Sequence, residues 1–174
     1  MTRRTLVSLP NLISFCRLPL AALFVGVPHA GARVALLLVA MLTDLLDGWM
    51  ARRVNAVTRA GALIDPIADR LFVLAVVLAY LAEGLLSAGQ VLVLLARDIM
   101  TAVGFGVARS VSWLRPVEFK ARWPGKVVTA LQLSTLLLVL LRPPLVPPLV
   151  VLVGVAAAIS VADYTLALWR ARAR

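Results

Sequence analysis

The sequence predicts an all-α integral membrane protein with six transmembrane helices. Of its 174 residues, 62% are hydrophobic and only 15% are charged. Soluble domains are typically about half apolar and a quarter charged, so this chain has too few polar side chains to cover a water-exposed surface. Apolar runs of about 20 residues recur along it, and that length crosses the hydrocarbon core of a bilayer.

The expected helices follow from these apolar runs and from the proline- and glycine-containing turns between them. They cover residues 11–27, 33–55, 61–83, 88–110, 124–142 and 147–170. The pairs Pro143-Pro144 and Pro147-Pro148 are expected to break the chain between the last two helices. Residues 111–123 form the one long connection, which is expected to lie in the headgroup layer. The whole chain, 1–174, is expected to form a single membrane domain.

The distribution of basic residues predicts the orientation. With the N-terminus in the cytoplasm, most of the arginines and lysines lie on the cytoplasmic side, which is the usual bias of membrane proteins. These are Arg3, Arg4, Arg52, Arg53, Arg59, Arg109, Arg115, Lys120, Arg122, Lys126, Arg170, Arg172 and Arg174. Both termini are therefore expected to be cytoplasmic, in a multi-pass protein of the cytoplasmic (inner) membrane. The formal net charge of +10 is assigned to contact with anionic lipid headgroups and not to nucleic acid.

Four aspartates form the candidate chemical site: Asp44, Asp47, Asp65 and Asp69. Side chains three or four residues apart share a helix face, so each pair is expected to project from one side of its helix. The first pair closes the second expected span and the second pair opens the third. A short basic connection joins the two spans, which should bring all four carboxylates to one depth near the cytoplasmic surface.

Four adjacent carboxylates repel one another unless a cation neutralises them. Oxygen ligands are those preferred by Mg²⁺, Mn²⁺ and Ca²⁺, and no histidine or cysteine accompanies the aspartates, which argues against zinc. One or two ions fit this ligand set. The alternative is that the acids form structural salt bridges with Arg52, Arg59 or Arg70, although acids within spans are more often functional.

Small residues accompany the aspartates. Gly48 and Ala51 share the face of Asp44 and Asp47, and Gly61 shares the face of Asp65. Such residues allow close helix packing or the approach of a flat ligand, and for each glycine taken alone packing is the better explanation. Arg52 offers a forked set of donors that can bind a phosphate.

Together these residues resemble the signature of the CDP-alcohol phosphotransferase family. The matching pattern is Asp44-x2-Asp47-Gly48-x2-Ala51-Arg52-x8-Gly61-x3-Asp65-x3-Asp69. Two further stretches resemble motifs of the bacterial phosphatidylglycerophosphate synthases within this family. They are Pro10-Asn11-x2-Ser14-x2-Arg17 and Trp123-x-Gly125-Lys126-x2-Thr129-x2-Gln132. The expected helix count and the length agree, so the resemblance covers nearly the whole chain.

The resemblance implies a bacterial phosphatidyltransferase. A metal ion, Mg²⁺ or Mn²⁺, would bind the pyrophosphate of CDP-diacylglycerol while an alcohol attacks and CMP leaves. By position, Asp44, Asp47 and Asp65 would be metal ligands, and Asp69 a ligand, the general base, or both. Gly48, Ala51, Arg52 and Gly61 would line the CDP site. The resemblance also implies a homodimer.

The acceptor implied by the resemblance is glycerol 3-phosphate, whose dianion requires cationic partners. The candidates are Arg97, Arg109, Arg115, Lys120, Arg122 and Lys126. Arg97 stands beside Asp98 inside an expected span, so the two could equally form a self-contained salt bridge, and the others could be ordinary cytoplasmic charge. Val128 replaces a second lysine usual in the synthases, and Asp98 replaces a glutamate.

Three alternatives remain open. The acceptor could be phosphatidylglycerol, which would give cardiolipin, or an inositol compound. A divalent-cation transporter is the alternative from another class. It would require acids along a path across the bilayer, whereas the aspartates are expected to cluster at one edge.

Overall fold

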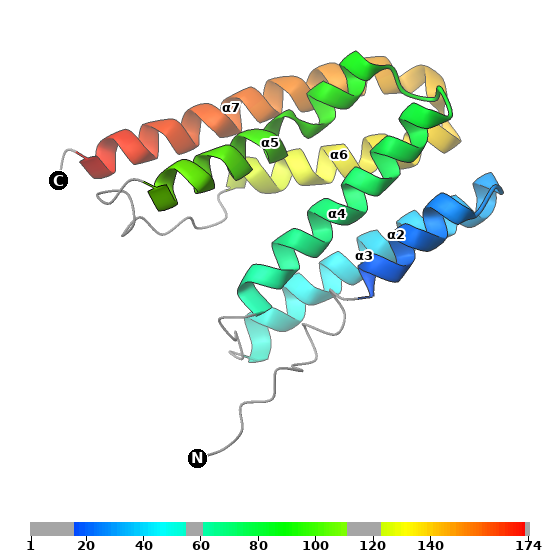
Figure 1. The fold of residues 1–174 in the computed structure, drawn as a ribbon, viewed down its shortest axis with the longest axis horizontal. Helices are drawn as coiled ribbons and strands as arrows, with labels where there is room; N and C mark the ends of the chain where they lie inside the picture. The colour runs from blue at the N-terminus through cyan, green and yellow to red at the C-terminus, as the bar shows by residue number, and fades with distance from the viewer. Residues whose placement is uncertain (1–15, 55–60, 111–122, 173–174) are drawn as a thin grey trace. The chain divides into compact units, whose positions relative to one another are not determined.

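The structure is a computed structural model that describes residues 16–54, 61–110 and 123–172. All regular elements in these ranges are helical (Figure 1). They are α2 (Arg17–Gly26), α3 (Ala30–Val54), α4 (Gly61–Ala82), α5 (Ala88–Ser110), α6 (Trp123–Leu141), the short 3₁₀ helix η2 (Pro143–Leu145) and α7 (Val146–Arg172). The all-helical prediction is confirmed, and the helices after the first agree closely with the expected ranges.

The chain divides into two compact units, Met1–Gly84 and Leu85–Arg174. In the first unit, α2 packs along α4 and also contacts α3 (Figure 1). In the second, α7 packs against both α5 and α6. The expectation of a single domain over 1–174 stays a prediction.

The core of the first unit consists of one buried stripe from each helix. Side chains at spacings of three and four residues share a helix face, and on each helix the buried apolar residues follow that spacing. The stripes are Ala21 and Phe24 on α2, Leu37 and Ala40 on α3, and Phe72, Val76 and Tyr80 on α4. The rings of Phe24 and Tyr80 meet edge to face, with centroids 5.6 Å apart, a favourable arrangement for two aromatic quadrupoles.

An ion pair closes one end of this core. Arg33, on the same face of α3 as Leu37, is buried and donates to both carboxylate oxygens of Glu83, at 2.5 and 2.6 Å. Its Nε donates to the carbonyl of Val27 at 2.7 Å, and its guanidinium lies 5.2 Å from the centre of the Phe24 ring. A forked guanidinium matches a carboxylate in this two-bonded way, so Arg33 links the α2–α3 turn to the end of α4.

The second unit is held by close packing of α5 and α6 on α7. Its buried apolar side chains include Val91, Leu94, Val128, Leu136, Val139, Val150, Val153 and Ala157. A Cβ atom at Gly154 of α7 would lie 3.1 Å from a methyl carbon of Val93 on α5. Glycine at that position therefore allows the two helices to approach closely.

The prolines after α6 act differently from the expectation. Pro143 opens η2, but Pro147 and Pro148 lie in the first turn of α7, which begins at Val146. The first N–H groups of a helix have no intrahelical acceptor, so proline costs no hydrogen bond there. The second pair therefore starts the last helix and does not break the chain before it.

Among the described residues, one stretch is long and apolar enough to cross a membrane: Pro143–Asp163, of 21 residues. The helices α3, α4 and α5 are of similar length but contain charged side chains, including Asp44, Asp69 and Arg97. These charges belong to the polar clusters described below.

Candidate active site

Three charged side chains meet at one end of the core of the first unit. Arg17 of α2 donates from Nη1 to Oδ1 of Asp69 on α4, and from Nη2 to Oδ1 of Asp44 on α3 at 3.4 Å. The Arg17 side chain is 4% exposed, whereas those of Asp44 and Asp69 are 43% and 40% exposed. A buried guanidinium therefore lies beneath two carboxylates that remain accessible to a ligand.

The apolar stripes explain why these side chains meet. Arg17 continues the buried face of α2, four residues before Ala21, and Asp44 continues the face of α3, four residues after Ala40. Asp69 precedes Phe72 by three residues on α4. Packing the three apolar faces together therefore brings the charged end of each face to one place.

The remaining predicted donor-site residues are placed by their helices. Asp47, Gly48, Ala51 and Arg52 lie on α3, and Gly61 and Asp65 lie on α4. Their side chains are outside the part of the chain that the structure describes. The structure thus confirms that the four aspartates come from two helices. Of the four, the structure describes the side chains of Asp44 and Asp69, and both of these contact Arg17.

The described carboxylates suit a hard divalent cation. Asp44 and Asp69 come from different helices and already share one cation, the Arg17 guanidinium. Carboxylate oxygens are the ligands that Mg²⁺ and Mn²⁺ prefer. Within the described residues, no group of three Asp, Glu, His or Cys side chains could hold a metal ion, and the side chains of Asp47 and Asp65 lie outside that part of the chain.

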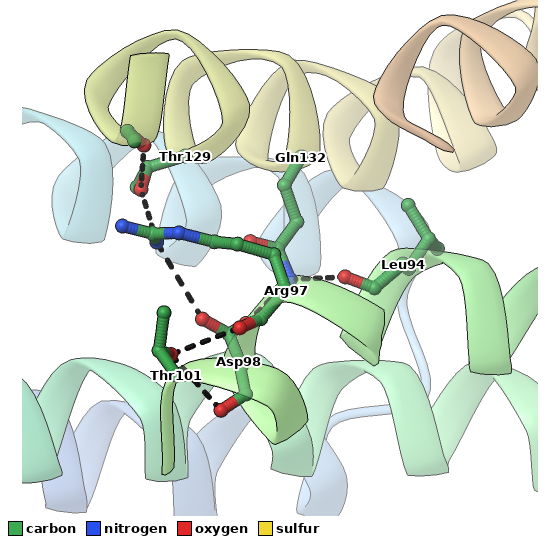
Figure 2. A network of polar contacts seen from close by, with 7 residues as sticks. Leu94, Arg97, Asp98, Thr101, Thr129 and Gln132 are labelled. Carbon is green, nitrogen blue, oxygen red and sulfur yellow. Dashed lines mark hydrogen bonds and ion pairs between the residues drawn. The ribbon is translucent and has the colours of Figure 1, made fainter. Parts of the chain in front are cut away.

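A second polar cluster lies in the second unit, between α5 and α6 (Figure 2). Arg97 Nη1 lies 3.6 Å from Oδ1 of Asp98 and donates to the Thr129 hydroxyl at 3.1 Å. The amide nitrogen of Gln132, a buried residue, donates to Oδ2 of Asp98 at 3.1 Å and to the Leu94 carbonyl at 3.0 Å. Arg97 and Asp98 therefore form the salt bridge that the sequence left open, and two residues of α6 orient it.

Gly125 completes this cluster. On α6, Gly125, Thr129 and Gln132 follow one another at spacings of four and three residues, so they share the face toward Arg97. A Cβ atom at Gly125 would lie 2.7 Å from Nη2 of Arg97, which is closer than real Cβ contacts allow. The glycine lets the guanidinium lie directly against the α6 backbone.

This contact leads to a testable prediction for Gly125→Ala. The added methyl group should push the end of the Arg97 side chain aside and weaken its bond to Thr129, at a cost of about 1 kcal/mol, because the displaced nitrogen is at the end of a flexible side chain. Thermal unfolding in detergent should show a lower Tm for this variant. Gly104→Ala on α5 is the matched control, because a Cβ there meets nothing within 4 Å. Equal Tm values for the two variants would contradict this role of Gly125.

The other predicted acceptor-binding cations are located only in part. Lys126 is exposed on the first turns of α6. Arg109 lies on α5, with its side chain outside the described residues. Arg115, Lys120 and Arg122 fall within 111–122, which also lies outside them.

Comparison with known families identifies one family that matches most of the chain. The profile of the family described as CDP-alcohol phosphatidyltransferase matches residues 7–169, which include both polar clusters. The chain belongs to the CDP-alcohol phosphatidyltransferase family. The resemblance inferred from the aspartate pattern is confirmed.

Curated relatives in this family are of two kinds. A Mycobacterium tuberculosis protein whose description names a cardiolipin synthase is 38% identical over 59% of this chain and 51% of its own length. A Streptomyces coelicolor cardiolipin synthase (CMP-forming) is 33% identical over 71% of this chain and 60% of its own. A CDP-diacylglycerol–glycerol-3-phosphate 3-phosphatidyltransferase of Salmonella paratyphi A is 32% identical over 78% of both chains. The chain thus spans about half the length of the mycobacterial relative.

Two features of these polar clusters were missed from the sequence. Arg17 was seen only as a motif residue within an apolar run, and Arg52, Arg59 and Arg70 were considered as partners of the aspartates instead. The available signal was the spacing of Arg17, which stands four residues before Ala21 and so continues an apolar face of the helix. Gln132 was likewise seen only as a motif residue, although its spacing from Gly125 places both on one face.

Proposed function

We propose that this protein transfers the phosphatidyl group of CDP-diacylglycerol to glycerol 3-phosphate, forming phosphatidylglycerol phosphate and releasing CMP. One observation carries this proposal: Asp44 on α3 and Asp69 on α4 both contact the buried guanidinium of Arg17 while remaining accessible themselves. Both aspartates lie within the residues that the family profile matches. A site of this kind suits a substrate whose pyrophosphate is bound through metal ions.

Asp44, Asp47, Asp65 and Asp69 would hold one or two Mg²⁺ or Mn²⁺ ions. The ions would supply charge neutralisation at the pyrophosphate and the transferred phosphoryl group. The donor set fits, because all four side chains offer carboxylate oxygens. The small residues Gly48, Ala51 and Gly61 and the forked donors of Arg52 would line the CDP site.

The reaction itself is a substitution at phosphorus. The acceptor hydroxyl oxygen forms a bond to the phosphorus that carries diacylglycerol, and the bond from that phosphorus to the bridging pyrophosphate oxygen breaks. CMP leaves with that oxygen. Asp69, which is accessible and fixed by Arg17, would accept the hydroxyl proton and then release it to water.

Glycerol 3-phosphate is the acceptor favoured by the comparisons. The relative named for that acceptor matches over 78% of both chains, further than the relatives named as cardiolipin synthases. The acceptor phosphate would bind among Arg97, Arg109, Arg115, Lys120, Arg122 and Lys126. Of these, Lys126 is exposed and Arg97 is held in place by Asp98 and Thr129.

Phosphatidylglycerol, giving cardiolipin, is the second candidate acceptor. The 38% identity with the mycobacterial relative favours it, as do Asp98 and Val128, which differ from the residues usual in the synthases. A cation transporter is the weaker hypothesis, because the family to which the chain belongs is described as one of phosphatidyltransferases. The test below separates all of these outcomes.

The proposed setting is the bacterial inner membrane, crossed by the six α-helices with both termini in the cytoplasm. Large apolar side chains exposed on these helices support this placement, including Leu42, Leu45, Leu92, Val151 and Ile159. Lipid solvates such side chains and water does not. We propose a homodimer as the functional unit on the strength of the family alone.

The test offers purified protein CDP-diacylglycerol with glycerol 3-phosphate, phosphatidylglycerol or inositol phosphate in parallel. We expect phosphatidylglycerol phosphate and CMP in equal amounts, no turnover after chelation with EDTA, and recovery on adding Mg²⁺ or Mn²⁺. Formation of cardiolipin alone would show that the acceptor is phosphatidylglycerol and not glycerol 3-phosphate. Failure with all three acceptors, or full activity of Asp47→Ala, would overturn the proposal.

A further inference from the structure

Arg17 carries a positive charge into the interior of the first unit. Its side chain is 4% exposed, so its guanidinium has lost nearly all contact with solvent. A buried charge is costly unless it is paired and hydrogen-bonded. Asp44 and Asp69 supply that compensation, one from each of the two helices that contribute the motif aspartates.

The other buried arginine of this unit shows what is unusual about Arg17. Arg33 places two nitrogens on a single carboxylate, that of Glu83, in the two-bonded geometry that makes such pairs strong. Arg17 instead divides its two terminal nitrogens between two carboxylates. This geometry does not give the strongest ion pair with either carboxylate. It does connect α3 and α4 through a residue of α2.

We propose that Arg17 is a positioning residue, the internal counter-ion that holds Asp44 and Asp69 together before a divalent cation binds. The part concerning the cation rests on the proposed function, whereas the part concerning the metal-free protein does not. Arg17 donates a hydrogen bond to one oxygen of each carboxylate, and about two-fifths of each aspartate side chain remains exposed. The two aspartates are thereby held near each other with part of each side chain open to a ligand.

Removing the guanidinium should have a distinctive consequence. Without Arg17, Asp44 on α3 and Asp69 on α4 repel each other, and the metal-free protein loses stability. A bound divalent cation supplies the missing positive charge at the same place. It should therefore stabilise an Arg17 variant more than it stabilises the unchanged protein.

The experiment measures thermal unfolding in detergent by tryptophan fluorescence, in EDTA and in Mn²⁺. In EDTA, Arg17→Gln should lower the Tm by about 5 °C or more. The rise in Tm on adding Mn²⁺ should be larger for Arg17→Gln than for the unchanged protein. Arg17→Lys keeps the charge but cannot bond both carboxylates with a fork, and it should fall between the two.

Arg33→Gln is the matched control. It also removes a buried arginine of the first unit from a carboxylate partner, so it should lower the Tm in EDTA. Glu83 is not one of the motif aspartates, so the rise in Tm on adding Mn²⁺ should equal that of the unchanged protein. This control separates loss of the internal counter-ion from general destabilisation.

A second pair of variants keeps the test decisive if Arg17→Gln does not fold. Asp69→Asn leaves the buried Arg17 with one charged partner fewer, and it should lower the Tm in EDTA. In the Asp69→Asn background the two carboxylates no longer repel each other, so Arg17→Gln should lower the Tm much less there than on its own, and the double variant should fold even if Arg17→Gln alone does not. Additive effects in EDTA, or a Mn²⁺ response no larger in Arg17→Gln than in the unchanged protein, would overturn the proposal. Absence of any Mn²⁺ response in the unchanged protein would count against the proposed metal site, and the EDTA cycle would still decide the role of Arg17.

Discussion

Replacing Asp69 with asparagine is expected to lower kcat for phosphatidyl transfer by about 100- to 10,000-fold, the range for loss of a positioned acid or base. Asparagine keeps the size of the side chain but cannot accept the hydroxyl proton. It is also a weaker ligand for a divalent cation than a carboxylate. Release of CMP from CDP-diacylglycerol in the presence of saturating acceptor measures the effect.

The Asp69 result is interpreted against two controls. Asp163→Asn removes a carboxylate from α7, in the second unit, and should leave kcat close to that of the unchanged protein. Mn²⁺ binding to Asp69→Asn, followed by calorimetry, separates the two roles of the residue. Retained binding with lost turnover would identify Asp69 as the base, whereas retained binding with near-normal turnover would exclude that role.

The ion pair at the other end of the same core gives the largest expected effect on stability. Glu83→Ala should lower the free energy of unfolding by about 2–3 kcal/mol, because it leaves the buried Arg33 without its counter-ion. The value lies below that for a fully buried pair because the Glu83 side chain is 40% exposed. Denaturant unfolding in detergent measures it.

The two partners of this pair should not be equivalent. Arg33→Gln frees Glu83, which already contacts solvent, so this change should destabilise the protein less than Glu83→Ala. Replacing both residues by leucine should recover part of the loss. A larger loss for Arg33→Gln than for Glu83→Ala would contradict the assignment of Arg33 as the more costly buried charge.

The same pair predicts a pH dependence of stability. The hydrogen bond from Arg33 holds the pKa of Glu83, which lies just beyond the end of α4, below its ordinary value of 4.5. A carboxylate whose pKa is lowered by folding stabilises the protein above its unfolded pKa, and this contribution is lost as the pH falls through the folded pKa. The Tm of the unchanged protein should therefore decrease when the pH is lowered below about 4.5. In Glu83→Gln, which lacks this carboxylate, the decrease in Tm over that pH range should be smaller.

Most of the helices could be predicted because their signals are local. The ranges 61–83, 88–110 and 124–142 correspond closely to Gly61–Ala82, Ala88–Ser110 and Trp123–Leu141. Apolar length and the turn residues between runs are visible without knowing any tertiary contact. The effect of Pro147 and Pro148 was harder to predict, since proline either ends a helix or begins one, and only the position of the first turn distinguishes the two.

The sequence by itself determined the helical class, the family and the motif aspartates, because hydropathy and helical spacing are properties of neighbouring residues. Tertiary structure decided which charges are partners. Asp44 and Asp69 stand 27 and 52 residues from Arg17, and Glu83 stands 50 residues from Arg33. Each arginine offers donors to any carboxylate within reach, so its partner depends on how the apolar faces of α2, α3 and α4 pack. That packing brought Arg17 to the aspartates, where the sequence had suggested only Arg52, Arg59 and Arg70.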